Sequence, residues 1–148
     1  MRNVFTGREC TFVWVVLESS ASAVLRRVRD MRDHMKLRAF ELADELALAV
    51  YGATKGFLKD EVFGLRSQLR RAAVSVASNI VEGCARYSKS DYIRFLDMAY
   101  GSAREVEYQV SLSFRLGYMN SDNSEALRML SAETSKVLNG LIRALRKQ

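Results

Sequence analysis

The chain has 148 residues, of which 49% are hydrophobic, so it fits a single domain with its own core and is not intrinsically disordered. It contains no proline, which favours long uninterrupted helices over an all-β fold that would use proline in turns and edge strands. A net charge of +6, from 23 basic and 17 acidic residues, favours an acidic partner such as nucleic acid, but solvated lysine and arginine on a helical protein explain it equally well.

Cysteine and histidine are too few for a metal centre or a disulfide framework. Cys10 and Cys84 lie far apart and follow no paired spacing, which indicates a reducing compartment, and His34 is the only histidine. No apolar run approaches the roughly 20 residues needed to span a bilayer. We therefore expect a cytoplasmic protein that holds no metal or cofactor and does not associate with a membrane.

The first 34 residues precede the regular pattern and have more than one interpretation. The short apolar stretch Thr11–Leu17, followed by small residues, resembles a secretory signal with a cleavage site, although the stretch is at the minimum length. Alternatively, residues 1–34 form an irregular, poorly ordered extension, or translation starts at Met31 or Met35. We expect the extension, followed by one folded domain over residues 35–148.

Helical periodicity begins at Leu37 and predicts a first helix, up to a break at residues 56–64 that supplies a loop. A second row of apolar residues widens its stripe, as expected for a helix that faces two neighbours. A second helix is predicted from about Phe63 to Arg86, with one apolar side and one polar side. The stripes are Phe40, Ala43, Ala47, Val50, Thr54 and Phe57 in the first helix, and Leu65, Leu69, Ala72, Val76, Ile80 and Gly83 in the second.

Two further helices follow. Ser88 and Asp91 form a capping-box pattern that predicts the start of the third, and Gly117 is placed to end it as its C′ residue. Asp122 with Glu125 is the predicted cap of the fourth. The stripes are Tyr92, Phe95, Ala99, Ser102, Val106, Val110 and Ser113 in the third helix, and Leu127, Leu130, Thr134, Val137, Leu141 and Leu145 in the fourth. Together the pattern predicts an all-α fold, an antiparallel up-down-up-down four-helix bundle with an irregular N-terminal extension.

The residues needed for catalysis are not arranged in any recognisable pattern. The carboxylate candidates are Glu82, Glu105 and Glu107, and the last two, being two apart on one helix, do not face each other. No Glu-x-x-His motif is present, which excludes the di-metal sites that four-helix bundles carry. We expect a protein without enzymatic activity and without catalytic residues.

The polar side of the second helix is the most informative feature. Arg71, Ser75, Asn79, Glu82 and Arg86 follow one another at steps of four, four, three and four, so they form one line along the helix. A solvated face with a Glu82–Arg86 ion pair is one interpretation. We favour a packed polar contact, within or between subunits, because asparagine is a poor helix former at a plain exposed position.

Basic residues alternate with aromatic ones across the second loop and the third helix. Such interleaving can stack bases and neutralise phosphates, but it also arises when core aromatics alternate with solvent-facing charges. Both interpretations stay open. The candidate nucleic-acid contacts are Arg66, Arg70, Arg86, Lys89, Arg94 and Arg104.

Several separated motifs resemble one known family. The most extended is the sequence from Phe63 to Gly83, FGLRSQLRRAAVSVASNIVEG, and three more follow in the family's order: Tyr92-Ile93-Arg94-Phe95-Leu96, the segment from Gly101 to Glu107, and Leu116-Gly117-Tyr118. They resemble the four-helix bundle proteins encoded in 23S ribosomal RNA intervening sequences. The resemblance covers about Leu37 to Arg146, with Leu58 standing where members commonly have proline.

The resemblance implies a bundle that assembles into a ring-shaped homopentamer with no known catalytic activity. The chain is also similar to the accessory variability proteins of diversity-generating retroelements, basic bundles that bind nucleic acid and a reverse transcriptase. Residues 35–148 hold 17 basic and 13 acidic residues, a net charge of +4, so five copies would carry +20. The family motif falls on Gln68, Arg71, Ser75, Asn79, Glu82 and Gly83, and on Gly101, Ser102 and Glu105, for which the resemblance implies a structural or assembly role.

Two functional hypotheses follow. The first is a non-enzymatic oligomer that binds RNA or DNA or acts as an adaptor, with itself, nucleic acid and a reverse transcriptase as candidate partners. The second is a purely structural or protein-interaction oligomer whose positive charge is incidental. Both predict self-association, and only the first predicts binding of a nucleic-acid probe that weakens as salt is added.

Overall fold

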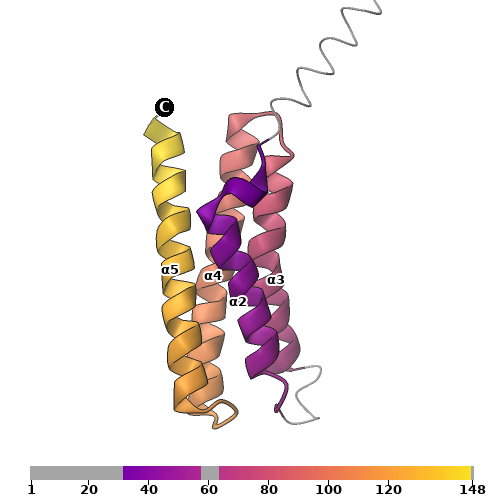
Figure 1. Ribbon diagram of the computed structural model, residues 1–148, viewed down its shortest axis with the longest axis vertical. Coiled ribbons are helices and arrows are strands. Elements are labelled where there is room, and N and C mark those ends of the chain that lie inside the picture. Colours follow the sequence, from indigo (N-terminus) through magenta and orange to yellow (C-terminus); the bar gives the residue numbers. More distant parts are fainter. Residues whose placement is uncertain (1–31, 58–63, 148) are drawn as a thin grey trace, which may run out of the picture. The chain divides into compact units, whose positions relative to one another are not determined.

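The computed structural model describes residues 32–57 and 64–147 of the protein. These residues form a short 3₁₀-helix, η1 (His34–Lys36), and four α-helices: α2 (Arg38–Ala53), α3 (Leu65–Cys84), α4 (Lys89–Arg115) and α5 (Ser121–Lys147) (Figure 1). No strand occurs within them. The predicted all-α four-helix bundle is therefore confirmed. Residues 1–31 of the predicted N-terminal extension lie outside the described residues.

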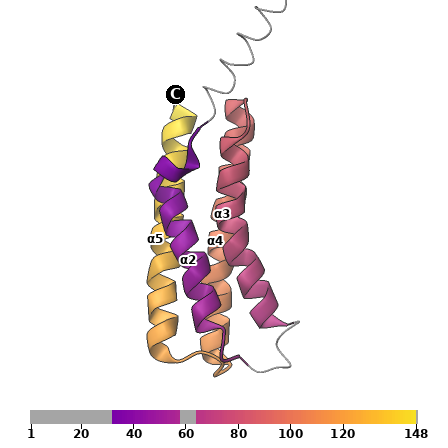
Figure 2. The same ribbon diagram turned by 45° about the vertical axis from the view of Figure 1, so that its right-hand side comes forward.

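Consecutive helices run antiparallel, and each helix packs against two others (Figures 1 and 2). α3 contacts α2 and α4, and α5 contacts α4 and α2; within the described residues the diagonal pairs α2–α4 and α3–α5 make no comparable contact. At 1.5 Å per residue, the 16 residues of α2 span about 24 Å and the 27 residues of α4 or α5 about 40 Å. α2 therefore covers only part of the length of the two longest helices.

The core consists of two clusters of buried side chains that follow each other along the bundle. One cluster lies where α2 begins and α5 ends, and includes the fully buried Ile80, Leu96 and Leu138. The other lies where α2 ends and α5 begins, around Leu46 and Leu69. Burying one side chain of this size contributes about 1.5–3 kcal/mol, so these apolar faces hold the helices together.

The predicted stripe of the fourth helix is partly wrong. Leu130, Val137, Leu141 and Leu145 are only partly buried, because the buried line of α5 runs beside them and includes the small side chains of Ser131 and Ser135. Two of the three buried hydroxyl groups of α5 donate to the preceding turn, as Thr134 Oγ1 does to the Leu130 carbonyl at 2.8 Å, whereas Ser135 Oγ has no hydrogen-bond partner among the described residues. The buried residues of α5 are Leu127, Ser131, Thr134, Ser135, Leu138 and Ile142.

Both predicted ends of the third helix are confirmed. Ser88 is the N-cap of α4, and its hydroxyl oxygen accepts the Asp91 backbone N–H at 3.0 Å and donates to the Asp91 carboxylate at 2.7 Å. At the other end Gly117 has a φ of +74°. The Gly117 and Tyr118 N–H groups donate to the carbonyls of Phe114 and Ser113 at 3.0 and 2.9 Å, which completes a Schellman motif.

The predicted cap of the fourth helix is wrong by two residues. The N-terminal cap of α5 is Asn120, whose Oδ1 accepts the Asn123 N–H at 2.8 Å, and Asp122 already lies in the first turn. The Schellman motif turns the chain so that Met119 is buried in the core, which makes the next residue the first that can cap the helix. Asp122 still interacts favourably with the positive end of the helix dipole.

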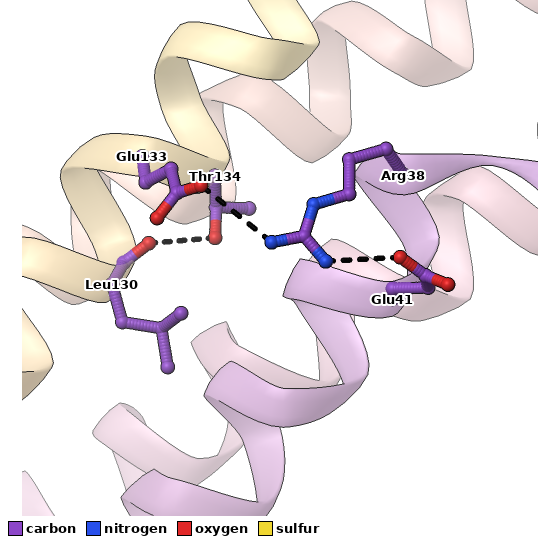
Figure 3. Close-up of polar contacts among 5 residues, drawn as sticks. All are labelled: Arg38, Glu41, Leu130, Glu133 and Thr134. Carbon is purple, nitrogen blue, oxygen red and sulfur yellow. Dashed lines mark hydrogen bonds and ion pairs between the residues drawn. The ribbon is translucent and has the colours of Figure 1, made fainter.

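An ion pair joins α2 to α5 at their exposed edge. Arg38 of α2 lies 3.6 Å from Glu133 of α5 and 3.0 Å from Glu41 of its own helix (Figure 3). All three side chains are more than half exposed, so the contact contributes less than about 1 kcal/mol. In the same turn of α5, the hydroxyl of Thr134 is turned toward the Leu130 carbonyl (Figure 3). The ion pair therefore adds little to what the two core clusters supply.

Candidate functional site

A groove of about 730 Å³ crosses the exposed face of α3 along its N-terminal half. Tyr51 of α2 borders it on one side and Glu105 of α4 on the other, and α3 supplies the rest of its lining. We call this site the α3 groove. It brings together six residues that the sequence singled out: Gln68, Arg71, Ser75 and Glu105 from the predicted polar face, and Arg66 and Arg70 from the predicted nucleic-acid contacts.

The charge at this end of α3 is the reverse of what would stabilise the helix. The helix begins after Gly64, which has no side chain to cap it. The first turn, from Leu65 onward, lies within the described residues and holds no acidic residue. Arg66, Arg70 and Arg71 instead lie within the first two turns. A cation in the first turn of a helix, such as Arg66, costs about 0.3–1 kcal/mol, and the effect falls off beyond that turn, whereas an anion bound at this end is favoured. The arginines therefore make the α3 groove an electrostatically favourable place for an anion.

Arg70 also holds the end of α2. Its Nε donates to Thr54 Oγ1 at 2.8 Å, its Nη2 lies 3.4 Å from the Tyr51 carbonyl oxygen, and its guanidinium lies over the Tyr51 ring at 4.6 Å. Thr54 is the C-terminal cap residue of α2 and is fully buried. This predicted nucleic-acid contact is thus fixed in position by structural contacts, with its charge kept beside the groove.

The middle of the polar line makes contacts within the chain. The hydroxyl oxygens of Ser75 and Ser102 lie 3.0 Å apart and join α3 to α4. Asn79 Nδ2 donates to the Ser75 carbonyl at 2.8 Å and lies 3.0 Å from the Ser75 hydroxyl. The unusual asparagine therefore orients the serine that bridges the two helices.

Gly83 lies on the apolar side of α3, as the predicted stripe of this helix indicated, although the family motif groups it with residues of the polar face. It is buried between α3 and α4, and a Cβ atom at this position would lie 3.0 Å from Phe95 Cβ and 3.2 Å from Tyr92 Cδ2. Its missing side chain permits close approach of the two helices. Its neighbour Glu82 is exposed and forms the predicted ion pair with Arg86.

The remaining predicted nucleic-acid contacts lie away from the α3 groove. Arg86 follows α3 with its guanidinium 4.7 Å from the Phe95 ring, and Arg94 lies 5.4 Å from the same ring. Arg104 pairs with Glu107 at 2.5 Å, and Lys89 is exposed at the start of α4. The structure therefore brings only two of the six predicted basic contacts, Arg66 and Arg70, into the α3 groove.

Sequence reasoning missed Tyr51 and Gln109. Tyr51 is 45% exposed and borders the groove, and its only signal in the sequence is that it lies off the apolar stripe of its helix. Gln109 is only 4% exposed, and its Nε2 donates to Glu105 Oε1 at 2.9 Å. The contact holds the Glu105 carboxylate in place, and the spacing of four residues on one helix was the signal that could have indicated it.

The buried titratable groups lie elsewhere in the bundle. Burial raises the pKa of the Cys84 thiol, and burial also raises the pKa of the Tyr92 hydroxyl to about 12, so both stay protonated at neutral pH. In residues 32–57 and 64–147 no cluster of histidine, cysteine and acidic side chains could hold a metal ion. Within the same residues no helix is long and apolar enough to span a membrane.

Comparison with known proteins gives one family. A crystal structure of a protein of unknown function from the S23 ribosomal protein family, from Bacteroides thetaiotaomicron, is 26% identical and superposes with a TM-score of 0.66. The match covers 71% of this chain and 95% of that one. No curated protein matches. Residues 35–140, more than half of the chain, match the family described as 23S rRNA-intervening sequence protein, and the chain therefore belongs to that family.

Proposed function

We propose that the protein is a non-enzymatic, self-associating module that binds RNA or DNA through the α3 groove. The observation that carries the proposal is the placement of Arg66, Arg70 and Arg71 around one groove at the positive end of a helix. The phosphate backbone supplies most of the affinity of sequence-independent binding, and arginine is well suited to contact it. Serine hydroxyls and the Gln68 amide in the same groove add neutral hydrogen-bonding groups.

Charge reversal in the groove tests the proposal. Arg66→Glu combined with Arg71→Glu removes two cations that lie in the groove, while leaving Arg70 on Thr54. Fluorescence anisotropy with labelled RNA and DNA should show weaker binding and a salt slope that is smaller by about 0.7–0.9 for each phosphate that the variant no longer neutralises. Lys136→Glu with Arg143→Glu, an equal charge change on the exposed side of α5, is the matched control. Equally weakened binding in both double variants would mean that net charge alone is responsible.

We also propose that the chain assembles with copies of itself, as a homopentamer according to the family resemblance. The part of α3 beyond the groove supports this, because Val81 is an exposed apolar side chain, 38% exposed, that does not line the groove. Light scattering should give a multiple of the monomer mass, and Val81→Glu should lower it. Leu48→Glu, at an exposed position on α2, should leave the mass unchanged. A monomer at high concentration would contradict the proposal.

A purely structural or protein-binding oligomer is the second candidate. It is favoured by the number of arginines that are occupied within the chain, since Arg70, Arg86 and Arg104 contact Thr54, Glu82 and Glu107. This function predicts assembly without probe binding at physiological salt. A reverse transcriptase, suggested by the similarity to accessory variability proteins, is the protein partner to test by titration with the purified enzyme.

A further inference from the structure

Resting on the proposed nucleic-acid binding, we propose that the α3 groove accepts a single strand rather than a duplex, and that Glu105 makes it favour bases with an exocyclic amino group. Three features of the groove support the proposal. They are its span across α3, the stacked pair formed by Arg70 and Tyr51, and a carboxylate among arginines.

The span of the groove indicates a strand. Tyr51 and Glu105 come from the two helices that flank α3, so the groove crosses that helix from one side to the other. An α-helix with its side chains is about 10–12 Å across, which is more than one base covers. A ligand that touches both borders therefore has several nucleotides, with its backbone crossing the arginines between them.

The Arg70–Tyr51 pair forms a platform on which a base can stack. Tyr51 is 45% exposed as a residue, and the guanidinium that lies over its ring at 4.6 Å is held by the hydrogen bond to Thr54. Stacking on aromatic rings and guanidinium planes is worth about 1–3 kcal/mol per base in single-strand binding proteins. The bases of a duplex are already stacked on one another, so only an unpaired base can use this platform.

The carboxylate of Glu105 is unfavourable for a ligand that offers phosphate alone. Gln109 donates to Oε1 at 2.9 Å, while Oε2 accepts no hydrogen bond within the described residues. A carboxylate accepts from an amino group such as N4 of cytosine, whereas uracil presents the O4 acceptor at the same position. Cytosine and uracil are otherwise of equal size, so they form a matched pair of probes for Glu105.

The experiment compares labelled oligocytidylate, oligouridylate and a duplex of the same length by fluorescence anisotropy on the full chain. Oligocytidylate should bind about three- to tenfold more tightly than oligouridylate, the effect of one charge-assisted hydrogen bond at a wet site. Glu105→Gln should abolish this ratio. Tyr51→Leu should weaken both single strands about fivefold or more without affecting the duplex, whereas Tyr51→Phe should bind as the unaltered chain does. Circular dichroism confirms that each variant retains its helices.

Two kinds of failure are distinguishable. Equal binding of duplex and single strands, an unchanged cytidylate-to-uridylate ratio in Glu105→Gln, or an unaltered affinity in Tyr51→Leu would each overturn the single-strand inference while leaving nucleic-acid binding intact. No salt-dependent binding of any probe, or binding that is indifferent to charge reversal at Arg66 and Arg71, would overturn the proposed function itself.

Discussion

Replacing Gly83 by alanine tests the close approach of α3 and α4. The new Cβ would lie 3.0 Å from Phe95 Cβ and 3.2 Å from Tyr92 Cδ2, whereas ordinary contacts begin at 3.4 Å, so the helices must separate by about 0.4 Å. Phe95 Cβ is attached directly to the backbone and the Tyr92 ring is buried, so neither can move aside easily, and such overpacking costs about 1–3 kcal/mol. Alanine returns up to about 1 kcal/mol of helix propensity, less near a helix end. The expected net decrease in unfolding free energy is about 1–2 kcal/mol.

The matched control is Gly140→Ala on the exposed side of α5. In the described part of the chain nothing lies within 4 Å of a Cβ at this position, so alanine should stabilise the protein by about 0.5–1 kcal/mol. Urea unfolding followed by circular dichroism, at one fixed protein concentration because assembly shifts apparent stability, measures both variants. If Gly83→Ala is as stabilising as Gly140→Ala, the assignment of Gly83 as a packing position is refuted.

Three further substitutions test single contacts by the same unfolding assay. The unaltered chain should lose about 2–3 kcal/mol of unfolding free energy between about pH 10, the ordinary tyrosine pKa, and about pH 12, because the unfolded chain releases the Tyr92 proton first. Tyr92→Phe should abolish this loss. Identical pH profiles of the two proteins would contradict the prediction. Ser88→Ala should cost about 1 kcal/mol as an N-cap, and no change would show that the cap is dispensable. Thr54→Val keeps the shape but takes the acceptor from Arg70 Nε, so a destabilisation of about 1–3 kcal/mol is expected, and an unchanged stability would mean that Arg70 finds another partner.

Local signals in the sequence predicted a helix end correctly where only one nearby residue was suited to the cap position. Gly117 adopts the positive φ that ends α4, and Ser88 caps it, as their positions indicated. The start of α5 was predicted two residues too late because Asn120 and Asp122 are both good cap residues. The choice between them depends on Met119, which is anchored in the core by contacts from distant parts of the chain.

Hydropathy predicted the orientation of α5 less well than that of the other helices. Leu130, Leu141 and Leu145 of its predicted stripe flank the core line, which passes through Ser131, Thr134 and Ser135. Small polar side chains can be buried when they bond their own backbone, as Ser131 Oγ does with the Arg128 carbonyl at 3.1 Å. A scale that treats each residue by itself cannot recognise such positions.

The candidate site was half visible in the sequence. Arg66, Arg70 and Arg71 are close neighbours on one helix, so their proximity follows from helical spacing alone. Tyr51 and Glu105 reach the same groove from two other helices, and their meeting depends on how far each helix has slid along its neighbour. Helical spacing within one chain segment contains no information on that relative position.

The dual engagement of Arg70 links occupancy of the groove to the integrity of α2. The same guanidinium bonds the final turn of that helix and, under the proposed function, would lend its charge to a bound strand, so a strand that leaves it in place would also restrain the helix terminus. Removing Arg70 would therefore destabilise the end of α2 and also weaken the proposed nucleic-acid binding. A lower affinity of that variant would then have two causes that the measurement does not separate. Arg66 and Arg71, which the described structure does not tie to α2, report on recognition alone.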